Sequence, residues 1–415
     1  MVFKLKDIDL RDIHYLKTYI RDEYYESNGI IKVFFNLFRK TIKSFFYDVK
    51  RALNKNNKKN KHLCFYGTDN QYNALAGIYE NLEDAELCSI TGAEGSHLPT
   101  FIGYIFSWIS IPVLIIYFNR YKGNKPWSSL PSFIETNFIV YGFYTWFLFY
   151  FSHIKPKSMI MSNDHSPMHR LIIVVCNSLH IPTVYIQHAS VTEKFPKLNF
   201  TISLLEGPDS FNKYKSKGID SKVYQVGMLK FDGYKNSVNK NKTLLSLGVA
   251  VNILDRFDKI SELLNHIRLS FPELKIILRP HPRDKRIREF YELCDNTTCV
   301  ISVSKEESSF DFLSKIDALI SSESSIHLEA VLMNVYPIYY LFGENIIDSY
   351  GYIKNNLITN TFVDLKKLKL LINELILFKP SVRHRCANYI STYNTNYDGR
   401  STFLVKKILS KELGY

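Results

Sequence analysis

The stretch that decides the fold is LKIILRPHPR at residues 274–283, and DALISSESSIHLEA at residues 317–330 has the same arrangement. In each, a short apolar run (274–278 or 317–320) of the length of a buried parallel strand leads into polar residues and then a helical pattern. Strands that alternate with helices in this way predict a parallel sheet covered on both faces. Both polar segments would then lie at carboxyl ends of strands, the edge where open α/β sheets bind ligands.

The same alternation runs through most of the chain and predicts an α/β protein with two Rossmann-like domains facing a cleft. With 415 residues, of which 46% are hydrophobic and 22% charged, the chain is long enough for two domains of roughly 200 residues. A linker rich in Lys, Asn and Ser at 235–242 separates them. We expect domains at 62–234 and 243–398 and a C-terminal helix within 399–415, with strands at 63–66, 86–90, 159–161, 183–186, 201–204, 223–226, 244–249, 274–278, 300–303, 317–320 and 337–341. The helices expected in the second domain include 253–270, 284–293 and 324–333.

The N-terminal segment 1–61 contains a basic amphipathic helix, predicted from Ile31 to Leu53. Phenylalanines and aliphatic residues recur at helical spacing, and lysines and arginines fill most other positions. Such a helix can lie on an anionic bilayer, or it can pack its apolar stripe on the protein's own core. The net charge of +13 requires an anionic partner. Because no nucleic-acid motif is present, we expect the inner membrane surface rather than nucleic acid.

Two long apolar runs, 101–118 and 133–151, approach the length of a membrane span. They lie between segments that must share one sheet, so we expect buried or interface-dipping helices. No secretory signal is visible in the first thirty residues. The six cysteines are scattered without a CxxC pair, which favours reduced thiols in a cytoplasmic protein over a disulfide or zinc framework.

The two polar segments of residues 274–330 offer groups that bind phosphate. A helix start with small hydroxyl residues presents unpaired N–H groups to an anion, and a nearby imidazole and guanidinium add donors and charge. Glu329 could reach a ribose hydroxyl or pair with a surface lysine, whereas His327 is expected on the helix surface. The alternative is structural, with two prolines forming a rigid strand exit and serines capping a helix. The candidate residues for nucleotide binding are Arg279, His281, Pro282, Ser321, Ser322, Ser324, Ser325 and Glu329.

A proton acceptor is expected across the cleft, at the carboxyl end of a strand in the first domain. His188 follows the strand 183–186, and imidazole is the side chain that titrates nearest neutral pH. Asp164 and His165 follow the strand 159–161 and are alternative bases, as is Glu94. No metal ligand set and no GxGxxG or GxxxxGK[ST] phosphate loop is present.

His281-Pro282 and the serines at 321–325 carry a resemblance to a known family. The chain resembles GT-B glycosyltransferases of bacterial capsule and lipopolysaccharide synthesis, such as polysialyltransferases and Kdo transferases, which share an HP motif and a serine-rich motif. The resemblance implies that His281, Ser321 and Ser322 hold the phosphate of a nucleotide-sugar donor. It also implies an inverting, metal-independent enzyme without a cofactor, which transfers the sugar of CMP-sialic acid or CMP-Kdo to a surface-polysaccharide or lipid-linked glycan and releases CMP.

One departure from this family keeps the donor open. Polysialyltransferase-like enzymes use a carboxylate beside a glycine, whereas the polyol-phosphate transferases and some capsule enzymes have a histidine followed by glycine. This chain has His188-Ala189. A CDP-polyol phosphotransferase of the teichoic-acid type is therefore an alternative. UDP-sugar 2-epimerases share the two-domain form, but they usually have a glycine pair where this chain has Ser324-Ser325.

Overall fold

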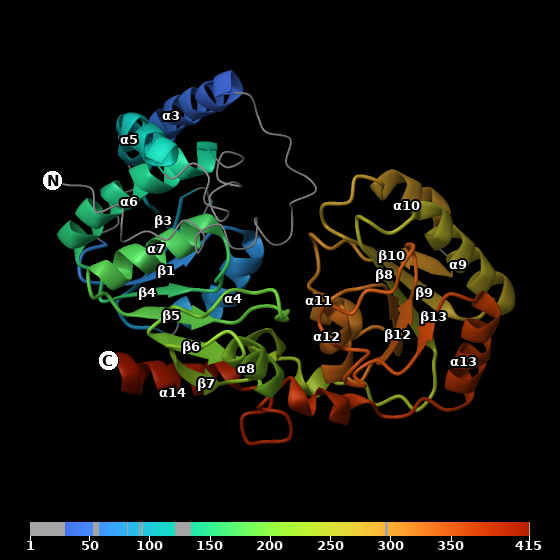
Figure 1. The fold of residues 1–415 in the computed structure, drawn as a ribbon. Coiled ribbons are helices and arrows are strands. Elements are labelled where there is room, and N and C mark those ends of the chain that lie inside the picture. The colour runs from blue at the N-terminus through green and yellow to red at the C-terminus, as the bar shows by residue number, and fades with distance from the viewer. Residues whose placement is uncertain are drawn as a thin grey trace.

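The computed structural model contains two parallel β-sheets, each the centre of one domain (Figure 1). The structure describes residues 30–52, 58–80, 82–90, 92, 94–120, 134–294 and 298–414. The first 29 residues of the predicted segment 1–61 therefore lie outside the described residues. The two sheets confirm the predicted pair of Rossmann-like domains.

The N-terminal sheet has seven parallel strands in the order β3-β2-β1-β4-β5-β6-β7. Two long helices connect edge strand β3 to central strand β4, and they confirm the prediction that both apolar runs are helical. The strands are β1 His62–Tyr66, β2 Ala85–Ser89, β3 Ser96–His97, β4 Ser158–Met161, β5 Thr183–Ile186, β6 Ile202–Leu205 and β7 Lys222–Gln225. The helices are α3 Ile30–Ala52, α4 Asp69–Tyr79, α5 Phe101–Arg120, α6 Ile134–Ile154, α7 Pro167–Ser178 and α8 Pro208–Lys215.

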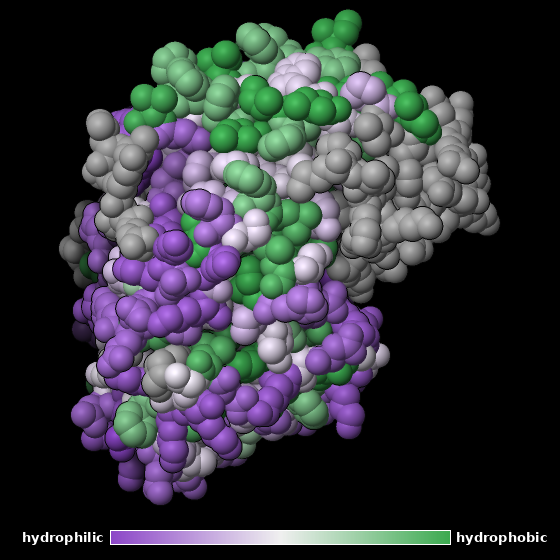
Figure 2. All heavy atoms as spheres, turned by 90° about the vertical axis from the view of Figure 1, so that its left-hand side faces the viewer, coloured by the Kyte–Doolittle hydropathy of each residue, from purple (hydrophilic) through white to green (hydrophobic). Residues whose placement is uncertain are grey.

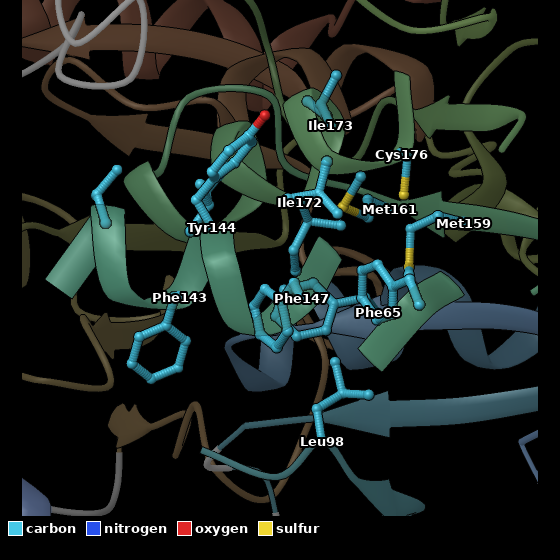
Figure 3. Close-up of a cluster of buried hydrophobic side chains, with 14 of the residues drawn as sticks. Phe65, Leu98, Phe143, Tyr144, Phe147, Met159, Met161, Ile172, Ile173 and Cys176 are labelled. Carbon is cyan, nitrogen blue, oxygen red and sulfur yellow. The ribbon is translucent and has the colours of Figure 1, made fainter. Parts of the chain in front are cut away.

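Side chains of these strands point alternately to the two faces of the sheet, and each face forms a separate buried core. Leu63 and Phe65 of β1 point into one cluster with Phe147 of α6 and Ile172 of α7, as Figure 3 shows for Phe65, Phe147 and Ile172. Their neighbours in β1 point to the opposite face, where α4 and the C-terminal helix lie. Both faces are covered, so the strands read as continuous apolar runs in the sequence.

The C-terminal sheet has six parallel strands in the order β10-β9-β8-β11-β12-β13. Its strands are β8 Ser246–Val251, β9 Lys275–Pro280, β10 Cys299–Ile301, β11 Ala318–Ser321, β12 Tyr336–Tyr340 and β13 Thr361–Phe362. The helices are α9 Phe257–Ser270, α10 Ile287–Leu293, α11 Ser309–Leu313, α12 Ile326–Leu332 and α13 Leu365–Leu377. Three 3-10 turns, η4 Leu229–Phe231, η5 Lys235–Ser237 and η6 Arg383–Asn388, flank this domain.

The chain crosses between the domains twice, first through η4 and later through the segment before helix α14 Ser401–Leu413. Val405 and Leu409 of α14 are buried in the core of the N-terminal domain, so the chain ends on the domain where it began. The two crossings touch at Gly227, which has φ +77°, and a Cβ there would lie 2.0 Å from Oγ1 of Thr392. A side chain is therefore excluded at this position by both conformation and space.

Several predicted boundaries were wrong. The helix expected from Ile253 begins at Phe257, and the one expected from Asp284 begins at Ile287. In both cases the preceding residues form a loop with hydrogen bonds of its own. The helix expected over 324–333 is shorter, Ile326–Leu332. The sequence analysis missed β3 and β13, which have two residues each and are too short to leave a pattern.

The prediction of six reduced cysteines was wrong at two positions, because Cys294 and Cys299 form a disulfide. The other four cysteines are free and buried, as expected. Among the described helices, none combines the length and the apolar character that crossing a membrane requires.

Candidate functional site

Three neighbouring strands of the N-terminal sheet end in polar residues at one edge. Strands β4, β5 and β6 are parallel neighbours, and each is followed directly by ionisable or amide side chains. His188 follows β5, the pair Asp164 and His165 follows β4, and Glu206 follows β6. The structure thus brings together three of the four predicted candidate bases and adds Glu206.

His188 lines a small cavity of about 60 Å³ together with Glu206 and Lys230. Burial and, to a smaller extent, the charge of Lys230 lower the pKa of His188 to about 4, so the imidazole is neutral at pH 7. Its Nδ1 atom is buried and has no hydrogen-bond partner among the described residues. A neutral imidazole with an unused ring nitrogen can accept a proton from a ligand.

Glu206 is the site residue that the sequence analysis missed. Its carboxylate accepts a hydrogen bond of 3.2 Å from Nε2 of Gln187, and burial raises its pKa to about 8 although Lys230 opposes this. At neutral pH its carboxyl group is therefore mostly protonated. The signal that could have found it is a carboxylate directly after strand β6, beside the strand that carries His188.

Asp164 and His165 form a second group at the same edge. Oδ1 of Asp164 lies 2.9 Å from Nδ1 of His165, and Oδ2 accepts a hydrogen bond of 2.6 Å from the hydroxyl of Tyr214. Burial raises the pKa of Asp164, but its pairing with His165 and Tyr214 outweighs this and lowers the pKa overall. Asp164 is thus enclosed and orients His165, whose ring is partly exposed.

The fourth alternative base, Glu94, does not join this group. It is exposed on the loop between β2 and β3. Strand β2 is separated from β5 by β1 and β4, which puts the two strands about 14 Å apart.

In the C-terminal domain, the register of the sheet brings the two predicted motifs to one edge. Ala250 of β8 pairs with Arg279 of β9 on one side and with Ser321 of β11 on the other. Arg279 and Ser321 therefore lie in register across the sheet, about 10 Å apart, because two strand spacings separate β9 from β11.

The loop after β8 joins these two motifs through hydrogen bonds. The Ser322 hydroxyl donates to Oδ1 of Asp255 at 2.8 Å, and Nδ2 of Asn252 donates to the carbonyl of Glu323 at 2.9 Å. From the other side, Arg286 donates to the carbonyl of Asp255 at 2.7 Å. Burial raises the pKa of Asp255. This bridging loop is a second feature that the sequence analysis missed.

His281 is half-buried, and Nδ1 of its ring accepts a hydrogen bond of 3.1 Å from the backbone N–H of Arg283. Partial burial and the charge of Arg283 lower its pKa, so the ring is neutral with its proton on Nε2, ready to donate to an anion. Pro282 is exposed. Arg279 is turned into its own domain, where it donates to Oγ of Ser302 at 2.6 Å and to the carbonyl of Glu307 at 3.0 Å.

The other serines serve local structure in this state. Ser321 donates to the carbonyl of Ala250 at 2.8 Å, Oγ of Ser324 accepts a long hydrogen bond from the N–H of Ile326, and Ser325 precedes the first residue of α12. The expectation that His327 lies on the helix surface was wrong. It is buried, and its Nε2 atom lies 3.0 Å from the carbonyl oxygen of Ser322.

Lys230 connects the two edges. It lies in η4, where Leu229 packs on the N-terminal core and Phe231 on the C-terminal core. Its ammonium lies 3.7 Å from the carboxylate of Glu329 on α12, and it lines the cavity of His188. Of the two roles predicted for Glu329, the structure shows the pairing with a lysine. That lysine lies at the domain junction rather than on the surface.

The loop that follows His188 is fixed to the C-terminal domain. The Ser190 hydroxyl is hydrogen-bonded to the hydroxyl of Tyr352, and Lys213 of α8 donates to the carbonyl of Tyr350 at 2.8 Å. A polar cavity of about 610 Å³ lies beside this loop and is lined from both domains, by residues that include Glu193, Lys194, Asn212, Asp348, Lys354 and Asn355.

Comparisons with known proteins establish the fold as GT-B. No protein-family model matches the chain, and no curated protein is similar to it in sequence. Among solved structures, it is similar to UDP-GlcNAc 2-epimerase from Neisseria meningitidis bound to UDP-GlcNAc, with a TM-score of 0.54 and 12% identity, over 85% of this chain and 100% of that one.

Two further structures have the same architecture. The glycosyltransferase of kitacinnamycin matches with a TM-score of 0.53 and 10% identity, over 86% of this chain and 100% of that one. The wall teichoic acid polymerase TagF, soaked with CDPG, matches with a TM-score of 0.51 and 12% identity, over 91% of this chain and 98% of that one. Fold neighbours thus include both of the enzyme types that the sequence left as alternatives.

Proposed function

We propose that this protein is an inverting, metal-independent glycosyltransferase of capsule or lipopolysaccharide synthesis. Its donor is a nucleotide-activated acidic sugar, CMP-sialic acid or CMP-Kdo, and its acceptor is a surface-polysaccharide or lipid-linked glycan. It works in the cytoplasm, on the inner face of the cell membrane. The observation that carries the proposal is the pair of facing strand edges. One carries a neutral imidazole whose Nδ1 atom has no hydrogen-bond partner among the described residues, and the other carries the groups proposed to bind phosphate.

In the proposed reaction, Nδ1 of His188 removes the proton from the acceptor hydroxyl. The hydroxyl oxygen attacks the anomeric carbon from the side opposite to the nucleotide, and the bond between that carbon and the phosphate oxygen breaks. A single displacement inverts the configuration. The negative charge that develops on the phosphate is stabilised by Nε2–H of His281 and by the hydroxyls of Ser324 and Ser325. Arg279 instead holds the end of β9 through Ser302 and Glu307.

The acceptor site proposed here is the polar cavity beside the loop after His188. Amide and charged side chains from both domains line it, and such groups suit the hydroxyl-rich surface of a glycan. Because Ser190 and Lys213 fix this loop to the C-terminal domain, an acceptor bound there would be held close to the base.

The runner-up is transfer of a polyol phosphate from a CDP donor. Its specific support is the histidine at position 188, since the resemblance assigns a histidine to that branch and to some capsule enzymes, and a carboxylate to the polysialyltransferases. The third alternative is a UDP-sugar 2-epimerase. The similarity in fold allows it, but these enzymes usually have a glycine pair where this chain has serines at 324–325.

A donor panel tests these alternatives. The full-length protein would be incubated with CMP-sialic acid, CMP-Kdo, CDP-glycerol and UDP-GlcNAc, and the release of CMP and the conversion of the sugar would be measured. We expect CMP release from one of the CMP-sugars. Release of CMP from CDP-glycerol alone would favour the polyol-phosphate reaction, and epimerisation of UDP-GlcNAc without transfer would favour the epimerase.

A further inference from the structure

Helix α3 turns its large apolar side chains outward. The side that packs on the protein begins with Val33 and Leu37 and continues with Thr41 and Ser44, whose hydroxyls bond to backbone carbonyls of their own helix. The opposite side exposes phenylalanines, with Phe35 65% and Phe46 66% exposed. A helix that served only to cover the core would have the reverse arrangement.

Helix α5 adds a second exposed apolar stripe. One of its sides packs closely on α6, where a Cβ at Gly142 would lie 2.2 Å from Oγ of Ser107. Another side exposes a row of isoleucines, including Ile109 at 54% and Ile116 at 68%. Ile102, Ile105, Ile109 and Ile116 share this side, and Ile115 is exposed beside them.

The two helices are held together, so the stripes form one rigid surface. Asp48 of α3 accepts hydrogen bonds of 2.8 Å from the backbone N–H groups of Thr100 and Phe101 at the start of α5. Trp108 of α5 donates to Oγ1 of Thr41 at 3.0 Å. Figure 1 places both helices on the N-terminal domain, away from the C-terminal sheet, and Figure 2 shows apolar side chains gathered over this end of the domain.

The charge around this surface identifies its occupant. Four cations of α3 are exposed, Lys32, Arg39, Lys43 and Lys50. The single acidic residue of the helix, Asp48, is taken up by the start of α5. Within α3, the apolar side chains are flanked by exposed cations and by no exposed carboxylate, which matches the boundary between acyl chains and anionic headgroups. An apolar face this large is also rare on a protein that stays free in solution.

We infer that the joint outer face of α3 and α5, here called the lipid-facing surface, binds an anionic bilayer without crossing it. The new element is α5: the surface is built from both helices, and the isoleucines enter the acyl boundary beside the phenylalanines. Only the purpose of this surface rests on the proposed function: it would bring the cleft to a membrane-borne acceptor.

Vesicle sedimentation with the full-length protein tests this. The vesicles would contain phosphatidylcholine alone or with phosphatidylglycerol. One variant would carry Phe35→Ser, Phe38→Ser and Phe46→Ser, a second Ile105→Ser, Ile109→Ser and Ile116→Ser, and a third Lys32→Gln, Arg39→Gln, Lys43→Gln and Lys50→Gln. The matched control would carry Leu269→Ser and Leu377→Ser, two exposed apolar residues of the C-terminal domain.

We expect the wild type and the control to bind the anionic vesicles, and each of the first two variants to bind about tenfold more weakly or worse. The third variant should lose its preference for phosphatidylglycerol. Circular dichroism and CMP or CDP binding should not change in any of them, which separates this surface from the nucleotide site. Undiminished binding by the isoleucine variant would overturn the composite surface. A wild-type dimer that the same changes dissociate, with no vesicle binding, would assign the face to a second copy of the chain.

Discussion

The strand edge of the N-terminal domain buries Asp164 and Glu206 and half-buries His188, whereas the facing edge of the C-terminal domain keeps His281 and Arg283 close to the surface. Burial leaves His188 and Glu206 without charge at neutral pH, with pKa values of about 4 and about 8. At the other edge, the Ser322 hydroxyl donates to Asp255, and the half-exposed imidazole of His281 accepts a hydrogen bond from the backbone N–H of Arg283. One edge is thus organised to move a proton, the other to receive an anion.

Replacement of His188 by alanine should give the largest effect, because it removes the proton acceptor of the N-terminal edge. We expect transfer to fall by about 10²–10⁴-fold, with binding of the donor nearly unchanged. The matched variant is His165→Ala, which removes the neighbouring imidazole. Initial rates and donor affinities of both variants decide between them, and a greater loss in His165→Ala would move the base to the Asp164 and His165 pair.

The C-terminal edge should respond differently to His281→Ala. We expect a loss of about 10²-fold in kcat/KM accompanied by weaker binding of CMP or CDP, since this imidazole is proposed to contact the phosphate. His384→Ala, an exposed histidine of the same domain, is the control. Calorimetry with the nucleotide alone would contradict the assignment if His281→Ala bound it as tightly as the wild type.

Lys230 lies between the two edges, and its replacement tests whether its charge is electrostatically coupled to His188. Because its charge lowers the pKa of His188, Lys230→Met should raise that pKa. Activity requires the unprotonated ring, so the acid limb of the kcat/KM profile, near pH 4 in the wild type, should move to higher pH. We expect about a tenfold loss of activity at neutral pH from the lost contact with Glu329.

Lys230→Arg keeps the charge and is the matched control for that profile. It should leave the acid limb where it is, whatever it does to the rate. If the limb stays in place in Lys230→Met as well, the two groups are not coupled, and the lysine has only a structural role at the domain junction.

The sequence could predict the strands and the edge of each sheet, because strands buried on both faces appear as uninterrupted apolar runs. It therefore placed His188, Asp164, His281 and Ser322 at strand ends. The boundaries of α9 and α10 could not be predicted, since the residues before them bond to a distant part of the chain, as Arg286 does to the loop after β8.

The residues that sequence reasoning missed depend on neighbours far away in the chain. Glu206 matters because β6 lies beside β5, and Lys230 because the linker passes between the domains. The exposure of His327 was predicted wrongly because a polar side chain is usually found on the surface, whereas every residue of the short helix α12 is buried. The spacing of α3 predicted a helix with two different sides, but not which side the rest of the protein would cover.

The smallest effect is expected on stability, from Glu206→Gln. The pKa of Glu206 is raised from 4.5 to about 8 in the folded protein, so between these values the folded state binds more protons than the unfolded state. The stability of the wild type therefore falls as the pH rises through this window. Glutamine mimics the protonated carboxyl and does not titrate. The Tm of Glu206→Gln should match the wild type near pH 4.5 and exceed it by a few degrees above pH 8.

The control for this comparison is Glu193→Gln on an exposed loop, which makes the same substitution outside the cavity of His188. Thermal unfolding followed by circular dichroism from about pH 5 to about pH 9 measures both. A constant difference for Glu206→Gln would mean that its carboxyl group titrates alike in the folded and unfolded states. The N-terminal edge would then carry a charge at neutral pH, and its contrast with the C-terminal edge would rest on His188 alone.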